Sequence, residues 1–328
     1  MEQYYIIPKT TIDDIEDSIQ RKRGSEAPIE PSEMPLAIDT IPSSVDGTDV
    51  PVGGIYLTKP DSNGNPTEAY IIGYAPVVNY TWTNILGGAY FPYLRKVEFI
   101  NTSNIISIEN WAFQNCSSLT TISLPDSVTS IGTEAFRSCS SLTTISLPDS
   151  LTSIGSSAFQ NCASLTSISL PDSLTSIGGW AFQYCTSLTT IKLPNSLTSI
   201  GSAAFGYCTS LTTIKLPNSL TSIGSAAFGG CTSLTTIKLP NSLTSIGSAA
   251  FGGCSSLENV TIENGFNCNN LNISPSTRYS VETMVSWFEA LADRTGQAPF
   301  TLTIGSTNLN KLTAEQKAIA TNKNWTLA

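Results

Sequence analysis

Seven cysteines recur along this chain at a constant interval of 23 residues, without one insertion or deletion. Seven phenylalanines, each three residues ahead of a cysteine, keep the same interval. A short period this regular is typical of one supersecondary unit stacked on copies of itself, so the middle of the chain is predicted to be a solenoid. The two ladders expected in its core are Phe113, Phe136, Phe159, Phe182, Phe205, Phe228 and Phe251, and Cys116, Cys139, Cys162, Cys185, Cys208, Cys231 and Cys254.

The copy that begins at Leu142 shows what the unit buries. Period-two alternation predicts that it opens with a short strand. Pro148 and Asp149 are expected to turn the chain, and Gly155 to permit a second turn. Helical spacing near the end of the unit predicts one helical turn that closes the coil. Eight positions are expected to face the core: Leu142, Ile145, Leu147, Leu151, Ile154, Ala158, Phe159 and Cys162.

The repeat array extends over residues 93–265. A looser copy near Leu94 is two residues longer than the others, and a half-copy begins at Leu257. One coil cannot bury its core face alone, whereas stacked neighbours can. Complete copies begin at Leu119, Leu142, Leu165, Leu188, Leu211 and Leu234.

Both halves of the unit, Leu-x-x-Ile-x-Leu-Pro and Ile-Gly-x-x-Ala-Phe-x-x-Cys, resemble the leucine-rich repeat of the BspA-like type. The resemblance implies an α/β-type solenoid, a right-handed coil with short parallel strands, closed by mixed α+β terminal caps. Family members of known role are mostly cell-surface proteins that bind host components, bacterial partners or matrix. A recognition role is therefore what the resemblance implies, while the period itself predicts only the solenoid.

Residues 1–45 are predicted to form a helical N-terminal attachment module. Helices are expected at 10–23, with a stripe of Ile12, Ile15 and Ile19, and at 32–38. This segment resembles a leader module of prophage tail-associated proteins of gut bacteria, which implies that it mounts the chain on a particle. Because the stripe is too narrow to fold alone, residues 10–40 are expected to contact that particle or another copy of the chain. Acidic residues in the first helix are interpreted as a solvated face, with a metal site as the alternative: Asp13, Asp14, Glu16 and Asp17.

Residues 46–92 are predicted to form a β-hairpin and an aromatic N-terminal cap. The hairpin strands are expected at 55–58 and 69–72, on either side of an Asn63-Gly64 turn signal. An aromatic stretch follows, and it is interpreted as a cover for the open first coil, with a sugar-stacking platform as the alternative. It comprises Tyr80, Trp82, Tyr90, Phe91 and Tyr93.

Residues 266–328 leave the repeat and are predicted to form an α/β C-terminal cap. Ser280 is expected to cap a helix that ends at Gly296. A strand follows at 301–304, and Thr313 begins a capping box for a helix to about Thr321. A last strand is expected at 325–327, and the segment resembles the closing segment of gut-bacterial and prophage repeat proteins.

The cysteine ladder is expected to consist of reduced, buried thiols that pack as small hydrophobic groups. The ladder has seven cysteines, and an odd number of cysteines cannot all form disulfides with one another. Cys268 lies off the repeat, and a disulfide with Cys254 is the alternative left open. The chain has no histidine and no Cys-x-x-Cys pair, so no structural zinc site, no other metal and no cofactor are expected.

The same composition argues against catalysis and against nucleic-acid binding. Without histidine, a Ser-His-Asp or Cys-His arrangement is impossible, and no phosphate-binding glycine motif follows a strand. We therefore expect that this chain is not an enzyme. The array has 6 basic and 8 acidic residues with no basic cluster, so phosphate backbones have no complementary surface.

The sequence predicts neither a signal peptide nor a membrane-spanning segment. Met1–Gln20 has no basic start followed by an apolar run, so no signal peptide is expected, although a chain cut after its leader would look the same. No stretch approaches the roughly 18 apolar residues of a membrane span. The expected location is a virion or the extracellular surface, and otherwise the cell surface.

Two rows of side chains are expected to point outward from the strands. The first row is Thr121, Thr144, Ser167, Thr190, Thr213, Thr236 and Asn259. The second row is Ser123, Ser146, Ser169, Lys192, Lys215, Lys238 and Thr261. The lysine-bearing coils also exchange an aspartate for an asparagine, since Asp126, Asp149 and Asp172 precede Asn195, Asn218 and Asn241. The array is thus acidic toward its N-terminal coils and basic toward its C-terminal coils.

These rows are the candidate ligand-binding surface. Stacked coils place the lysines about 5 Å apart, where like charges repel, so a facing anion would relieve them. The hypothesis is contact with a glycan, a teichoic polymer or an acidic protein; the alternative is that duplication copied one variant. Three functions remain open: a receptor-binding part of a phage or prophage particle, a bacterial surface adhesin, and an ice-binding or architectural solenoid.

Overall fold

The computed structural model describes residues 4–6, 39–40, 54–58, 68–72, 92–100 and 105–328. The helices expected at 10–23 and 32–38, with the acidic residues of the first, lie outside these ranges. So do four of the five aromatic residues expected in the N-terminal cap: Tyr80, Trp82, Tyr90 and Phe91. The repeat array and the C-terminal cap are described almost completely.

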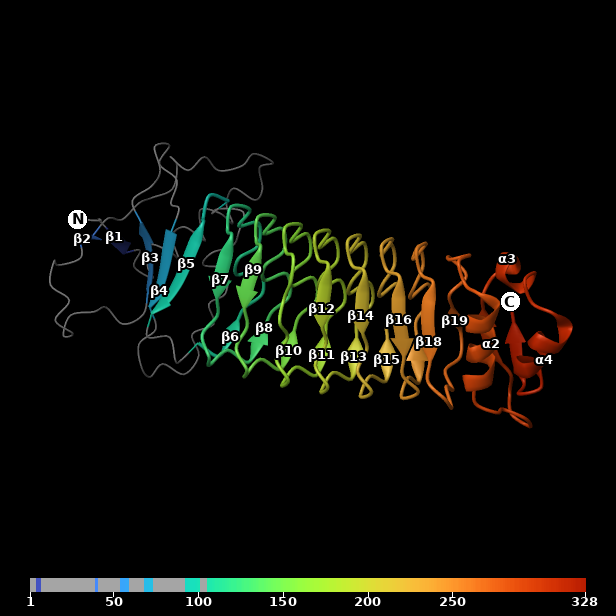
Figure 1. Cartoon of the computed structure of the whole chain (residues 1–328). Helices are drawn as coiled ribbons and strands as arrows, with labels where there is room; N and C mark the ends of the chain where they lie inside the picture. Colours follow the sequence, from blue (N-terminus) through green and yellow to red (C-terminus); the bar gives the residue numbers. More distant parts are fainter. Residues whose placement is uncertain (1–3, 7–38, 41–53, 59–67, 73–91, 101–104) are drawn as a thin grey trace, which may run out of the picture.

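The array is a rod with parallel strands on two of its sides, as the fold class predicted (Figure 1). Strands of neighbouring coils pair in register, so Ile191 lies opposite Ile214. The first side carries β7 (Thr121–Ser123), β9 (Thr144–Ser146), β12 (Thr190–Lys192), β14 (Thr213–Lys215), β16 (Thr236–Leu239) and β18 (Asn259–Ile262). The second side carries β6 (Ser107–Ile108), β8 (Ser130–Ile131), β10 (Ser153–Ile154), β11 (Ser176–Ile177), β13 (Ser199–Ile200), β15 (Ser222–Ile223) and β17 (Ser245–Ile246).

The helical turn expected at the end of each coil is wrong. The N–H of Phe159 donates to the carbonyl of Ala181 in the next coil at 2.7 Å, whereas the N–H of Gln160 donates to Ser157 three residues back at 3.0 Å. Left-handed backbone at Ser157 (φ 55°) and Asn161 (φ 61°) causes this alternation. A helix cannot continue through such residues, so the segment is a run of turns that bonds to its neighbour as a third side of the rod.

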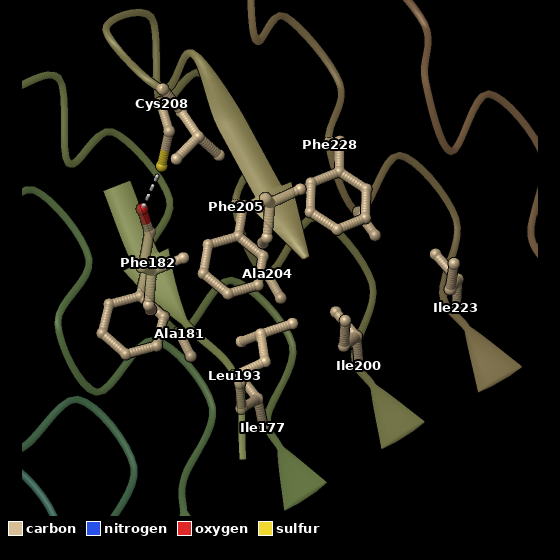
Figure 2. Close-up of a cluster of buried hydrophobic side chains, with 14 of the residues drawn as sticks. Ile177, Ala181, Phe182, Leu193, Ile200, Ala204, Phe205, Cys208, Ile223 and Phe228 are labelled. Atoms are coloured by element: carbon tan, nitrogen blue, oxygen red, sulfur yellow. Dashed lines mark hydrogen bonds between the residues drawn. The ribbon is translucent and has the colours of Figure 1, made fainter. Parts of the chain in front are cut away.

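The core predicted from the repeat is confirmed. In the coil from Leu142, seven of the eight expected positions are buried, and Leu147 is half-buried. Neighbouring phenylalanine rings stack along the rod with centroids 5.1–5.5 Å apart. Figure 2 shows Phe182, Phe205 and Phe228 in this stack. Each added coil therefore buries a phenyl ring against the one before it, which apolar burial favours.

The repeated glycine has a different role from the turn that the sequence predicted. Gly155 does not have a left-handed backbone. A Cβ added to it would lie 2.6 Å from the carbonyl carbon of Gly132 in the preceding coil, and one added to Gly178 would lie 2.6 Å from that of Gly155. Coils approach so closely at this position that any side chain would push them apart.

A small sheet lies beside the first coil. β3 (Gly54–Thr58) pairs antiparallel with β4 (Glu68–Ile72), which confirms the expected hairpin pairing. β4 pairs parallel with β5 (Lys96–Ile100), the strand of the looser first copy. Two strands that the sequence did not predict, β1 (Tyr4–Ile6) and β2 (Asp39–Thr40), extend the sheet beyond β3. The segment expected to be an attachment module thus adds strands to the sheet of the N-terminal cap.

The C-terminal cap combines a three-stranded sheet with three helices. The sheet consists of β19 (Leu271–Asn272), β20 (Phe300–Thr303) and β21 (Trp325–Leu327). The helices are α2 (Val281–Ala290), α3 (Ser306–Leu309) and α4 (Ala314–Thr321). The buried indole of Trp287 on α2 donates to the carbonyl of Val260 at 2.7 Å and so joins the cap to the last strand of the array.

Both predicted N-terminal helix caps of this region are present in the structure. Ser280 accepts from the N–H of Thr283, and Thr313 forms the predicted capping box with Gln316. The prediction that the first helix runs to Gly296 is wrong. It ends at Ala290, because Leu291 is extended and forms a bridge with Phe266. The limits of the four predicted domains stay predictions.

Candidate recognition surface

The first strand side presents the two rows expected from the sequence. All six threonines and serines of the first row, from Thr121 to Thr236, are exposed, and so are the six residues of the second row, from Ser123 to Lys238. Their central isoleucines point inward and are buried, for example Ile191 and Ile214. The alternation within each short strand therefore places hydroxyls and lysines outside at a regular spacing.

The lysines stand in register on adjacent strands. Lys192 pairs with Lys215 across β12 and β14, and Lys215 pairs with Lys238 across β14 and β16. Parallel strands place such residues about 4.8 Å apart. Lys238 differs from the other two, because its Nζ lies 2.6 Å from Oε1 of Glu263. Within the described part of the chain, the side chains of Lys192 and Lys215 have no such partner.

Glu263 holds the last lysine of the row in place. Its carboxylate also accepts from the N–H of Asn241 at 3.2 Å. The hydrogen bond from Lys238 lowers the pKa of Glu263, so this carboxylate is ionised at neutral pH. The positive charge available to a ligand is therefore concentrated at Lys192 and Lys215, a distinction that the sequence pattern did not reveal.

An open groove of about 550 Å³ lies at the acidic end of the same side. It contains five of the predicted site residues: Thr121, Ser123, Thr144, Ser146 and Ser169. The sequence analysis missed Asp149, Leu147 and Pro171 as further parts of its lining. The groove coincides with a break in the strand pairing, because residues 166–168 form no strand and Ser169 alone bridges to Lys192.

The remaining predicted site residues lie outside the groove. Ser167, Thr190, Thr213 and Thr236 continue the first row, and the three lysines continue the second. Asp149 lines the groove, Asp126 and Asp172 are exposed at the same position in the flanking coils, and Asn195, Asn218 and Asn241 are exposed in the coils that carry the lysines. The acidic-to-basic change along the array is therefore present on the molecular surface.

The cysteine ladder is buried and unpaired. All eight cysteines are free, so the alternative disulfide between Cys254 and Cys268 is not formed. Burial raises the pKa of Cys116 and of Cys185 to about 12. A buried thiol with a raised pKa is a poor nucleophile and a poor metal ligand, since both roles need the thiolate.

The described part of the chain shows neither a metal cluster nor a membrane-spanning helix. No group of three or more histidine, cysteine, aspartate or glutamate side chains there could hold a metal ion. No helix there has both the length and the apolar character needed to cross a bilayer.

Parallel strands, a buried leucine and phenylalanine interior and a constant short repeat together define a leucine-rich repeat solenoid. The family described as BspA type leucine rich repeat region matches in six copies over residues 84–210 and 175–275, and the chain belongs to this family.

Solved structures of leucine-rich repeat proteins are similar to this chain. A leucine rich repeat protein of T. pallidum is 31% identical, and the match covers 58% of this chain and 84% of that protein's chain, with a TM-score of 0.44. A leucine rich cell surface protein of Faecalibacterium prausnitzii is 21% identical, with coverages of 86% and 94% and a TM-score of 0.37. A leucine-rich repeat protein of Eubacterium ventriosum is 19% identical, with coverages of 79% and 78% and a TM-score of 0.39. No curated protein matches the chain.

Proposed function

We propose that this chain is a non-catalytic recognition protein that binds a ligand on a cell or host surface through the first strand side of its array. Membership of the BspA type family supports a surface-binding role. The observation that carries the proposal is the pair of exposed, in-register lysines Lys192 and Lys215, which have no ion-pair partner among the residues that the structure describes and lie beside a continuous row of hydroxyls. The absence of histidine from the whole sequence supports a role without catalysis.

The chemistry of this side favours an extended polar or anionic ligand. Two lysines on neighbouring strands about 4.8 Å apart repel each other, and an anion that contacts both removes that repulsion. The hydroxyl row supplies donors and acceptors to the same ligand. A glycan with acidic groups, a teichoic polymer or an acidic protein segment fits this pattern, and a continuous row suits a polymer better than a compact molecule.

The test compares two variants of the full chain with equal loss of charge. Lys192→Ser/Lys215→Ser restores the serine found at this position in Ser123, Ser146 and Ser169. Arg278→Ser/Lys317→Ser removes two positive charges from the C-terminal cap. Binding of labelled protein to intact bacteria and to host cells is measured by flow cytometry at low and at physiological salt.

The expected result is weaker binding for the first variant only, with a smaller dependence on salt than the unmodified chain shows. Equal binding by both variants and by the unmodified chain would refute the role of the lysines. An equal loss in both variants would assign the effect to net charge and count against a specific strand-side site.

We further propose that residues 1–45 mount the chain on a phage or prophage particle, with attachment to the bacterial surface as the alternative. The resemblance of this segment to prophage tail-associated leaders is what supports mounting. Because β1 and β2 pair within the N-terminal cap, substitution is a cleaner test than deletion. Changing Ile12, Ile15 and Ile19 to Ser is expected to abolish attachment to particles while leaving binding to cells intact. Genomic neighbours discriminate further, since tail genes favour the particle and cell-wall genes favour the surface adhesin.

A further inference from the structure

Exposed aromatic side chains gather on the turn side of the rod, away from both strand sides. Trp180, Tyr184 and Tyr207 are 46%, 40% and 49% exposed. Trp180 and Tyr184 belong to one coil, and Tyr207 occupies the position of Tyr184 in the next. At the position of the two tyrosines the other coils carry only asparagine, serine or glycine, including Asn161 and Gly230. Aromatic rings in water are costly to expose, so a local cluster of three needs an explanation.

Trp180 stands between two coils whose corresponding residues are buried. The residues at its position in the two flanking coils, Ser157 and Ala203, are both buried. Ala226, the same residue type one coil further, is half-buried, and Ala249 is exposed. Along this row the residues in the two coils that flank Trp180 are thus the most buried. Trp180 itself, at 46% exposure, presents much of its indole to solvent.

The rings of Tyr184 and Tyr207 pack against each other in neighbouring coils. They stack with centroids 4.9 Å apart and an interplanar angle of 13°. Tyr207 also covers the backbone of Gly230, because a Cβ added there would lie 2.7 Å from its ring. The stack thus runs along the rod from Gly230 through Tyr207 to Tyr184, and Asn161 occupies the same position in the preceding coil.

Neutral amides accompany the rings. The side-chain amide of Gln160 donates to that of Gln183 at 2.5 Å, and Gln183 lies over Gly206. Each amide in this pair retains donors and acceptors for a further partner. Asn161, at the tyrosine position of the preceding coil, adds another amide. The turns at 155–164, 178–187 and 201–210, which hold these rings and amides, contain no charged residue.

The rings stand on backbone that bulky residues disfavour. Trp180, Tyr184 and Tyr207 have φ of 56°, 61° and 58°. Left-handed backbone is costly for large side chains, whereas glycine and asparagine tolerate it. Other coils use these cheaper residues at the tyrosine position, as Asn161 and Gly230 show. Residues that keep an unfavourable backbone conformation and also expose apolar surface are typical of a binding site.

We propose that Trp180, Tyr184 and Tyr207, with the amides of Gln160, Asn161 and Gln183, form a site for a neutral saccharide. The apolar C–H face of a pyranose ring stacks on the open indole, and its hydroxyls bond to the flanking amides. The ridge is too small for a protein partner, because stable protein interfaces bury roughly 1,200 Å² or more and three half-exposed rings supply only part of that. The site is separate from the strand side and does not depend on the lysines.

The test uses residues that the chain already carries at the same positions. Trp180→Ser, Tyr184→Asn and Tyr207→Gly copy Ser157, Asn161 and Gly230, so the triple variant is expected to fold with an unchanged or higher unfolding temperature. Trp111→Ser is the matched control, since Trp111 is 42% exposed at the same place in a coil without the tyrosines. The probes are immobilised neutral polysaccharides: a β-glucan, a mannan, a galactan and chitin.

Binding of the full chain to at least one of these probes is expected, at least about tenfold weaker in the triple variant and unchanged in Trp111→Ser. Lys192→Ser/Lys215→Ser is expected to bind the probe normally, which separates this site from the strand side. No binding to any probe by the unmodified chain, or equal binding by the triple variant, overturns the proposal. So does aromatic-dependent binding to cells that survives periodate oxidation of their glycans, because that result assigns the rings to a protein partner.

Discussion

The thiol of Cys208 donates a hydrogen bond of 3.1 Å to the carbonyl oxygen of Phe182, the core phenylalanine of the preceding coil (Figure 2). Each cysteine of the ladder from Cys139 to Cys254 donates the same hydrogen bond to the phenylalanine carbonyl of the preceding coil, at 3.0–3.2 Å. The Phe182 carbonyl also accepts from the N–H of Cys185 in its own coil. The cysteine therefore fills core volume and gives a buried carbonyl a second partner, which alanine or valine could not do.

Replacing this thiol should cost stability for both reasons. Cys208→Ala removes the sulfur from a fully buried site and leaves the Phe182 carbonyl with one donor. The expected loss is about 1–3 kcal/mol in the free energy of unfolding, measured by urea denaturation. Thr209→Ala, which removes a half-buried hydroxyl next in the chain, is the control and should change stability little. Equal effects of the two substitutions would contradict the role of the thiol.

The raised thiol pKa values predict loss of stability in alkali. Burial raises the pKa of Cys185 and Cys254 to about 12, while an unfolded thiol ionises near about 8.5. The unfolded chain therefore releases protons first, and the thiol contribution to stability is complete below about pH 8.5 and lost as pH rises toward 12. Each buried thiol should steepen the loss by up to about 1.4 kcal/mol per pH unit.

Urea denaturation between pH 7 and 10 measures this slope. A variant with Cys208→Ala and Cys231→Ala is expected to show a shallower fall, because two of the responsible groups are gone. In the native chain at pH 8, a disulfide reagent such as DTNB should react only at the rate of unfolding. Rapid labelling of the folded protein, or the same alkaline slope in the double variant, would argue against a protonated ladder.

Sequence alone was sufficient for the core and insufficient for the contacts between coils. Phe159 and Cys162 were placed inside because an identical period leaves one consistent inward face. The second strand side went unrecognised because Ser153–Ile154 is a two-residue strand, too short to show a period. The role of Gly155 also went unrecognised, since its constraint comes from Gly132 in another coil and not from its own backbone.

Surface features were the hardest to predict. The outward rows follow from alternation within a strand, but the groove coincides with missing strand pairing at residues 166–168, which depends on contacts between coils. The ion pair of Lys238 depends on Glu263, 25 residues away and brought near only by stacking. Trp180 departs from the small residues at its position in four other coils, and that departure was a signal that sequence analysis could have used.

Close approach at the repeated glycine predicts a strict requirement for glycine. A Cβ at Gly201 would lie 2.4 Å from the N atom of Gly179 and 2.6 Å from the carbonyl carbon of Gly178, and backbone atoms cannot move aside. Gly201→Ala should therefore lower the free energy of unfolding by about 1–3 kcal/mol or more. Gly179→Ser is the matched control, because Ser202 and Ser225 occupy this position in later coils and the nearest atom to a Cβ there is 3.2 Å away. Urea denaturation of both variants should separate them clearly, and similar stability would show that the coils can move apart.

The Lys238–Glu263 pair predicts how the basic end of the strand side can be changed without touching a lysine. The hydrogen bond from Lys238 lowers the pKa of Glu263, so the contribution of the pair to stability is present above the ordinary glutamate pKa and is lost as pH falls below it. Because Lys238 is about half exposed, that contribution is small, and Glu263→Gln should leave thermal unfolding nearly unchanged.

Glu263→Gln should nevertheless strengthen the binding of anions, because it releases Lys238 to join Lys192 and Lys215. Retention of the full chain on an immobilised polyanion such as polyphosphate measures this effect at increasing salt. Glu289→Gln is the control, since Glu289 is exposed on α2 and its substitution changes net charge equally. Greater retention of Glu263→Gln than of Glu289→Gln is expected at low salt, and the difference should shrink as salt screens the lysines. Identical retention of the two variants would mean that overall charge governs binding and that the lysine row does not act as a unit.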